Sequence, residues 1–157
     1  MAKRTKITRA NKQSPSLIVS ANGFRSSALL KRINLNGTVF SGQSQGKKFL
    51  ELPWVKRQIE EKLGFTPYPG TLNILLSEES AKRRKLLETA HSIKVCHAEG
   101  YCNGAIYQAF IGDLKCAIVI PDVKDYPRNV LEVIAPENLR AQLKVKDGDE
   151  IAVTVTL

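Results

Sequence analysis

The chain has 157 residues, of which 43% are hydrophobic and 25% are charged, as is typical of one soluble globular domain. No apolar run approaches the roughly 20 residues that cross a bilayer, and the N-terminus lacks the apolar stretch of a secretory signal. We therefore expect a cytoplasmic protein without a membrane partner. The formal net charge is +9, which makes nucleic acid a partner to consider.

The basic residues are concentrated near the N-terminus. Residues 1–50 hold ten of the 24 Lys and Arg and no Asp or Glu, whereas the remainder holds 14 bases and 15 acids. Such a leader can bind nucleic acid or can be a solvated tail. We favour the tail, because no aromatic residue for base stacking precedes Phe24 among these bases. We predict a basic, partly disordered extension over residues 1–33 and a folded domain over residues 34–157.

Hydrophobic periodicity and turn residues predict the following elements in chain order. These are a short strand over 17–24, one or two helical turns over 27–33, strands over 35–42 and 47–52, a helix over 53–65, a strand over 71–76, a helix over 77–90, strands over 92–97, 104–111, 114–120 and 129–135, a helical turn over 136–143 and a last strand over 150–157. Pro53 suits a first helical position, Gly64 suits a helix end, and Ser77 suits a helix cap.

Most of these strands follow one another without an intervening helix. This order argues against a doubly wound parallel sheet. It favours a closed or nearly closed β-barrel in which two helices are inserted early.

The first candidate site is the segment "GQSQGKK", residues 42–48. A glycine-containing loop can direct several backbone N–H groups toward one anion. The segment is not a Walker loop, because Lys48 rather than Ser or Thr follows Lys47. From the pattern alone, a plain hairpin loop is favoured over a phosphate-binding loop.

The second candidate site is "PYPGTLN", where a rigid turn precedes a strand. Residues at i and i+2 of a strand share a face, so Thr71 and Asn73 can offer a hydroxyl and an amide oxygen to one point. Mg²⁺ accepts such neutral oxygen ligands when phosphates supply the charge. The alternative is that both side chains merely satisfy the backbone of the turn.

The third candidate is Glu132, which shares a strand face with Val130 and Ile134 in "VLEVIAP". A carboxylate between two apolar residues lies either at a solvated edge or in the interior with a partner. Both alternatives stay open at this point.

The cysteines are Cys96, Cys102 and Cys116, an odd number without a Cys-x-x-Cys pair. A metal site that includes His97 is conceivable, but four ligands at zinc spacing are absent. We expect reduced, partly buried thiols.

From about residue 35 to residue 157, the chain resembles the archaeal-type, CTP-dependent riboflavin kinases. The segments that carry the resemblance are "GTVFSG", "LGFTPYPGTLNI", "AIVIPDVKDYP" and "VLEVIAPENLR". The resemblance implies a mainly β fold, a compact six-stranded cradle-loop barrel. It also implies transfer of the γ-phosphoryl group of CTP to the 5′-hydroxyl of riboflavin, which gives FMN and CDP. We expect a monomer.

The resemblance also implies roles for individual residues. Thr71 and Asn73 would bind Mg²⁺, and Glu132 would be the catalytic residue, which holds the ribityl chain near the attacking hydroxyl. Lys124 would occupy the flavin-contact position. The nucleotide would be bound by Gly42, Gln43, Ser44, Gln45, Gly46 and Lys47 at its phosphates and by Glu137, Asn138, Leu139 and Arg140 at its cytosine end.

Two segments depart from the family pattern. Residues 42–46 lack the middle glycine and the acid of Gly-x-Gly-Glu-Gly, and Lys124-Asp125-Tyr126 stands where the family has Thr-His-Tyr. These departures motivate a second hypothesis, a nucleotide- or flavin-binding module of the same fold that has lost kinase activity. A third hypothesis is nucleic-acid binding through the basic extension.

Overall fold

The computed structural model describes residues 31–42, 45–98 and 101–157. The strand expected over 17–24 and most of the helical turns expected over 27–33 lie outside these residues. Where the expected helical turns overlap the described part they are wrong, because Arg32 and Ile33 already belong to a strand.

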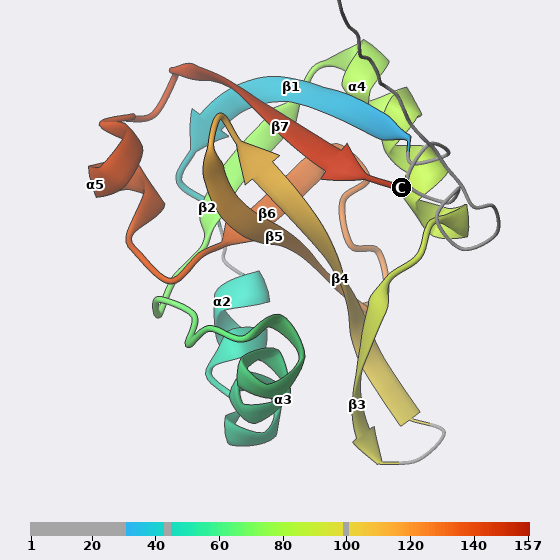
Figure 1. The fold of residues 1–157 in the computed structure, drawn as a ribbon. Helices are drawn as coiled ribbons and strands as arrows, with labels where there is room; N and C mark the ends of the chain where they lie inside the picture. The colour runs from blue at the N-terminus through green and yellow to red at the C-terminus, as the bar shows by residue number, and fades with distance from the viewer. Residues whose placement is uncertain (1–30, 43–44, 99–100) are drawn as a thin grey trace, which may run out of the picture. The chain divides into compact units, whose positions relative to one another are not determined.

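The fold is mainly β, with short helices in some of the connections between strands (Figure 1). The strands are β1 (Arg32–Phe40), β2 (Leu72–Leu76), β3 (Ile93–Ala98), β4 (Tyr101–Ile111), β5 (Leu114–Pro121), β6 (Val130–Ile134) and β7 (Glu150–Thr156). The helices are α2 (Gln45–Leu50), α3 (Pro53–Leu63), α4 (Glu78–Arg83), the 3₁₀ helix η2 (Arg84–Thr89) and α5 (Leu139–Leu143).

The strands form one antiparallel sheet in the order β3-β4-β5-β6-β2-β1-β7. An additional pairing of β4 with β7 joins the two sides, so that six strands close into a barrel and β3 extends it as an extra strand. Figure 1 shows the closing strand β7 between β1 and β4. The expected six-stranded barrel is confirmed.

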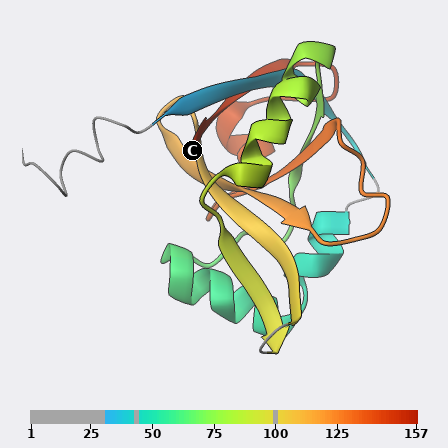
Figure 2. The same cartoon turned by 90° about the vertical axis from the view of Figure 1, so that its right-hand side faces the viewer.

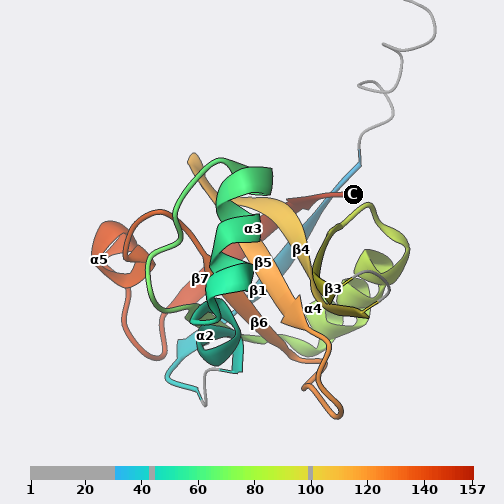
Figure 3. The ribbon, with the colours of Figure 1, turned by 90° about the horizontal axis from the view of Figure 1, so that it is seen from below.

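Two apolar clusters stabilise this fold. One is built from alternating strand residues inside the barrel, including Leu35, Ile118 and Val153, all fully buried. The other lies between the outer face of the sheet and the pair α2–α3, which Figure 3 shows side by side in front of the strands. Burial of each large apolar side chain contributes about 1.5–3 kcal/mol. Along β5 and β6, residues that face the barrel cluster alternate with residues that face the outer cluster, as Ile118 and Val119 do.

Helix α3 follows the sequence prediction closely. It begins at Pro53, and Gly64 ends it in the left-handed conformation with φ 81°. Val55 and Ile59 are buried against the sheet. None of the described helices combines the length and the apolar character that a membrane crossing requires.

Helix α2 contradicts the strand expected over 47–52. Phe49 and Leu50 are adjacent and both buried in the outer cluster. Successive residues of a strand point to opposite faces, so a strand could not bury both on one side. Packing of these two side chains under α3 favours the helix over the weak local strand pattern.

The helix expected over 77–90 is divided in the structure. Ser77 caps α4 as predicted, because its hydroxyl accepts a hydrogen bond from the Ser80 N–H at 3.2 Å. From Arg84 the chain tightens into the 3₁₀ helix η2. Ser80 is buried and accepts a 2.8 Å hydrogen bond from the Asn36 N–H of β1, so α4 is anchored beside β1 (Figure 2). The described part therefore has more helices than the two expected.

The expectation of reduced cysteines is wrong for Cys96, which is disulfide-bonded. The antiparallel register of β3 and β4 pairs the backbone of Cys96 with that of Cys102. Sequence spacing alone did not reveal this cross-strand neighbour. Cys116 is a free thiol in the barrel cluster, and burial raises its pKa to about 12.

Candidate functional site

The strand register places the predicted polar residues in one row. Asn73 on β2 pairs with Phe40 on β1 and with Glu132 on β6, and Glu132 pairs with Val119 on β5. Leu131 and Val133 belong to the barrel cluster, so the intervening Glu132 lies on the outer face of the sheet.

Glu132 is buried, with only 3% of its surface exposed. Its Oε1 accepts a 2.9 Å hydrogen bond from the Thr71 hydroxyl, and its Oε2 accepts a 2.7 Å bond from the Tyr126 hydroxyl. Buried carboxylates are tolerated when donors satisfy them. Of the two alternatives left open by the sequence, the structure selects the interior carboxylate with partners.

The Asn73 amide joins this carboxylate to the loop that follows β1. When its nitrogen is oriented toward the carboxylate, it donates to Thr71 Oγ1 at 3.0 Å and to Glu132 Oε1 at 3.3 Å. Its oxygen then accepts from the Gly42 N–H at 3.0 Å. This orientation satisfies both ends of the amide, whereas the reverse one directs two donors at each other. We call Gly42, Thr71, Asn73, Tyr126 and Glu132 the carboxylate network.

Gly42 is required at its position for steric reasons. A Cβ there would lie 2.8 Å from the Phe40 ring and 3.0 Å from the Asn73 amide. Any larger residue would push the loop away from the carboxylate network.

The turn before β2 is tied to β6. The Tyr68 N–H donates to the Ala135 carbonyl at 2.8 Å, and Pro67 is buried. Gly70 adopts φ 143°, which L-residues with a side chain rarely reach. This rigid turn positions the Thr71 hydroxyl beside the Glu132 carboxylate.

A small cavity of about 160 Å³ lies beside Thr71. Tyr68, Glu137, Asn138 and Arg140 line it together with Gly70 and Thr71. Asn138 caps α5 by accepting from the Ala141 N–H, and its amide nitrogen donates to the Tyr68 hydroxyl at 3.1 Å. The cap thus links α5 to the rigid turn.

Arg140 connects α5 to the end of β1. Its guanidinium donates to Asp147 Oδ1 at 2.6 Å and to the Phe40 carbonyl at 3.2 Å. The Ser41 hydroxyl donates to the same Asp147 carboxylate at 2.9 Å. These hydrogen bonds hold the pKa of Asp147 below its usual range.

On the other side of Glu132, a cavity of about 450 Å³ lies between α4–η2 and the connection from β5 to β6. Tyr126 forms part of its wall, with Arg84, Asp122 and Arg128. The Arg84 guanidinium lies 5.9 Å from the centre of the Tyr126 ring. Burial, followed by the hydrogen bond to Glu132, raises the pKa of Tyr126 well above its usual range.

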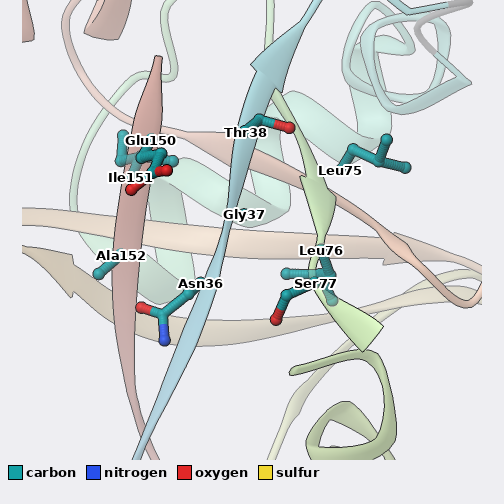
Figure 4. A pocket seen from close by; sticks show the side chains of 9 residues that line it. All are labelled: Asn36, Gly37, Thr38, Leu75, Leu76, Ser77, Glu150, Ile151 and Ala152. Carbon is teal, nitrogen blue, oxygen red and sulfur yellow. The ribbon is translucent and has the colours of Figure 1, made fainter. Parts of the chain in front are cut away.

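A third hollow, of about 540 Å³, crosses β7, β1 and β2 (Figure 4). Among the described residues that line it, Glu150 is the one charged side chain. The hollow shares no residue with the carboxylate network, and we assign it no role.

Comparison with known proteins identifies the family. The family model CTP-dep_RFKase, described as "Domain of unknown function DUF120", matches residues 39–155. The chain belongs to the CTP-dependent riboflavin kinase family. The matched range contains every residue of the carboxylate network, Arg140 and Asp147.

Curated relatives agree with this assignment. The chain is 39% identical to "Riboflavin kinase" of Methanosarcina barkeri over 77% of its own length and 56% of the relative. It is 40% identical to that of Methanospirillum hungatei, over 81% and 59%. For Ignicoccus hospitalis the identity is 38%, over 80% and 72%. The chain therefore spans little more than half the length of the first two relatives.

The structure brings together most of the residues that the family resemblance selected. Thr71, Asn73 and Glu132 are in mutual contact, and Gly42 joins them. Among the residues expected at the cytosine end, Glu137, Asn138 and Arg140 line the 160 Å³ cavity with the buried Leu139.

The remaining predicted residues lie around this centre. Gln43 and Ser44 lie outside the described residues, and Gln45 and Gly46 begin α2. Lys47 lies on α2 and is exposed. The predicted loop therefore connects a strand, β1, to a helix, α2, and not to a second strand. Lys124 is exposed and does not line the 450 Å³ cavity.

The oxygen donors fit a hard divalent cation. Thr71 Oγ1 and a carboxylate oxygen of Glu132 are 2.9 Å apart, and the Asn73 amide would present its oxygen to a cation beside them if it turned away from the Gly42 N–H. Mg²⁺ takes such oxygen ligands and completes its shell with water and phosphates. Within the described part of the chain, no cluster of three His, Cys, Asp or Glu offers a different metal site.

Sequence reasoning did not select Tyr126, Arg84, Ser41 or Asp147 as site residues. Ser41 and Asp147 are 106 positions apart, and no periodic pattern relates them. Tyr126 was noted only as part of the segment in which the flavin-contact position falls. Its contact with Glu132 depends on the path of the connection between β5 and β6, which the pattern does not specify.

Proposed function

We propose that this chain transfers the γ-phosphoryl group of CTP to the 5′-hydroxyl of riboflavin, giving FMN and CDP. The observation that carries the proposal is the carboxylate network. It sets a buried carboxylate beside the Thr71 hydroxyl and the Asn73 amide, and the amide oxygen links them to the backbone N–H of Gly42. Positioning and charge neutralisation, which phosphoryl transfer chiefly requires, can both be supplied by such an arrangement.

We place the nucleotide on the Gly42 side of the network. The phosphates would lie along the loop of residues 42–47, where the Lys47 ammonium adds positive charge. The base would lie in the 160 Å³ cavity between Tyr68 and α5. Asn138 and Arg140 line that cavity and offer hydrogen-bond donors for the carbonyl and ring nitrogen of a cytosine.

We place the acceptor on the Tyr126 side. The 450 Å³ cavity has a size suited to a small organic ligand. Arg84 Nε is buried there without a hydrogen-bond partner among the described residues, and an acceptor atom of a flavin ring would satisfy it. The ribityl chain would then reach Glu132.

Glu132 would orient the attacking hydroxyl. A carboxylate offers about four acceptor positions, and a substrate hydroxyl would take one of them beside the hydrogen bonds from Thr71, Tyr126 and the Asn73 amide. Glu132 would accept the hydroxyl proton late in the transfer. Mg²⁺, held by Thr71 and Asn73, would neutralise charge on the nucleotide phosphates.

The test is incubation of the protein with Mg²⁺, riboflavin and either CTP or ATP, followed by chromatographic detection of FMN. We expect FMN with CTP, none after removal of Mg²⁺ with EDTA, and a strong loss in Glu132→Gln. Riboflavin and CDP binding without FMN from either donor would instead support the binding module. FMN from ATP alone would overturn CTP as the donor.

A further inference from the structure

We infer that Tyr126 is a positioning residue, whose hydroxyl fixes the Glu132 carboxylate in the orientation that phosphoryl transfer needs. This inference rests on the proposed kinase function. It concerns a residue that acts on the reaction through Glu132 and not by its own contact with the reacting atoms.

The two carboxylate oxygens of Glu132 are held from different parts of the chain. Thr71, next to β2, donates to Oε1 at 2.9 Å, and Tyr126 donates to Oε2 at 2.7 Å. With both donors, rotation of the carboxylate plane would break at least one bond. Thr71 and the Asn73 amide both donate to Oε1, so Tyr126 supplies a point of attachment at the other oxygen, Oε2.

Tyr126 is itself held on several sides. Its N–H donates to the Val123 carbonyl at 3.1 Å, and the preceding Asp125 adopts φ 63° in the left-handed region. A non-glycine residue rarely adopts this conformation, so the turn is maintained by its surroundings. The Arg84 guanidinium packs over the ring and also donates to the Arg128 carbonyl at 2.9 Å. Arg84 thereby connects η2 to the segment that presents Tyr126.

The ring and the hydroxyl of Tyr126 make different contacts. The ring lines the 450 Å³ cavity while its hydroxyl contacts Glu132. Tyr126→Phe therefore separates the two features, because it preserves the ring and removes only the hydrogen bond. A positioning role predicts that kcat changes and that riboflavin affinity does not.

The experiment measures kcat, KM and the dissociation constant of riboflavin by flavin fluorescence for wild type and Tyr126→Phe. A hydrogen bond to a charged group is worth about 1.5–3 kcal/mol, so we expect kcat to fall roughly tenfold to a hundredfold. The riboflavin dissociation constant should change less than about twofold. Tyr107→Phe is the matched control for loss of a tyrosine hydroxyl, because Tyr107 is a buried residue of the barrel cluster. It should leave kcat unchanged.

A double-mutant cycle decides whether Tyr126 acts through Glu132. In a Glu132→Gln background, Tyr126→Phe should lower the residual rate by less than about threefold, since the carboxylate that it positions is gone. Full additivity of the two effects would overturn the inference. So would an unchanged kcat in Tyr126→Phe, or a riboflavin affinity that falls as much as kcat.

The outcome for wild type separates this inference from the proposed function. Absence of FMN formation by wild type with every donor would remove the kinase function and, with it, the positioning role. An active wild type combined with an unaffected Tyr126→Phe would remove the positioning role alone.

Discussion

Arg140 Nη2 lies 2.6 Å from Asp147 Oδ1, and the guanidinium also reaches the Phe40 carbonyl at the end of β1. Ser41, one residue before Gly42, donates to the same carboxylate. Asp147 therefore bridges α5 and the start of the glycine loop. Arg140 is thus engaged by protein groups while it lines the 160 Å³ cavity, where we propose that the base binds, and Asp147 determines where its guanidinium lies.

We predict that Asp147→Asn weakens CDP binding by roughly two- to fivefold, because solvent screens an exposed ion pair and limits its contribution. The melting temperature should change little. Calorimetric titration with CDP at low and high salt is the measurement, and the difference from wild type should shrink at high salt. Asp113→Asn, which removes an equal charge at the exposed β4–β5 turn, is the control. Equal effects of both variants would contradict the prediction.

Thr71→Val should raise the Mg²⁺ concentration required for half-maximal activity and for CDP binding. The valine keeps the shape of the side chain but removes the oxygen beside Asn73 and Glu132. The defect should diminish at high Mg²⁺, because mass action compensates for a lost ligand. Thr154→Val removes a hydroxyl that bonds Asn34 on the β1–β7 pair and should behave as wild type. A defect independent of Mg²⁺ would argue against the metal assignment.

Lys124→Thr restores the residue that the family pattern has at this position. Because Lys124 is exposed and outside the cavity wall, its ammonium can remain in solvent while a flavin binds. We expect riboflavin affinity to improve modestly, by less than about threefold, whereas Glu132→Gln should weaken it much more. Lys115→Thr controls for the change in charge. Riboflavin binding that appears only in Lys124→Thr would show that wild type uses a different acceptor.

Cys116 predicts a specific dependence of stability on pH. An unfolded thiol has a pKa near 8.5, whereas burial raises the pKa of Cys116 to about 12. The folded state therefore retains a proton that the unfolded state loses, and the free energy of unfolding falls as pH rises from about 8.5 toward 12. Between pH 7 and 9.5, wild type should lose about 1 kcal/mol more than Cys116→Ala in urea unfolding. Parallel losses in both proteins would refute this.

The sequence could predict the barrel because its main signal is local. Alternation along 150–157 identifies the face with Val153 and Val155, and both are buried in the barrel cluster. The strand expected over 47–52 was wrong because burial of Phe49 and Leu50 depends on α3 and on the outer face of the sheet. The expectation for Cys96 was wrong for a related reason, since its neighbour depends on the β3–β4 register.

In the candidate site, too, the local contacts could be predicted from the sequence and the distant ones could not. Thr71 and Asn73 are two positions apart on one strand, and their proximity follows from that spacing. Glu132 is 61 positions from Thr71, so only the family resemblance could bring the two together before the fold was known. Arg84 reaches Tyr126 from η2, and nothing in either local pattern indicates that contact.

The closure of the barrel by β7 has a consequence for biosynthesis. Arg32 at the start of β1 pairs with Thr156 near the end of β7, and β7 also pairs with β4. β1 can pair with β2 early in synthesis, but a ribosome must translate nearly every residue of the described domain before β1 gains its second neighbour, β7. Until then, β1 and β4 carry unpaired edges that can join strands of another nascent chain. Pairings between residues so distant in sequence form slowly, so these two edges are the last of the barrel to be covered.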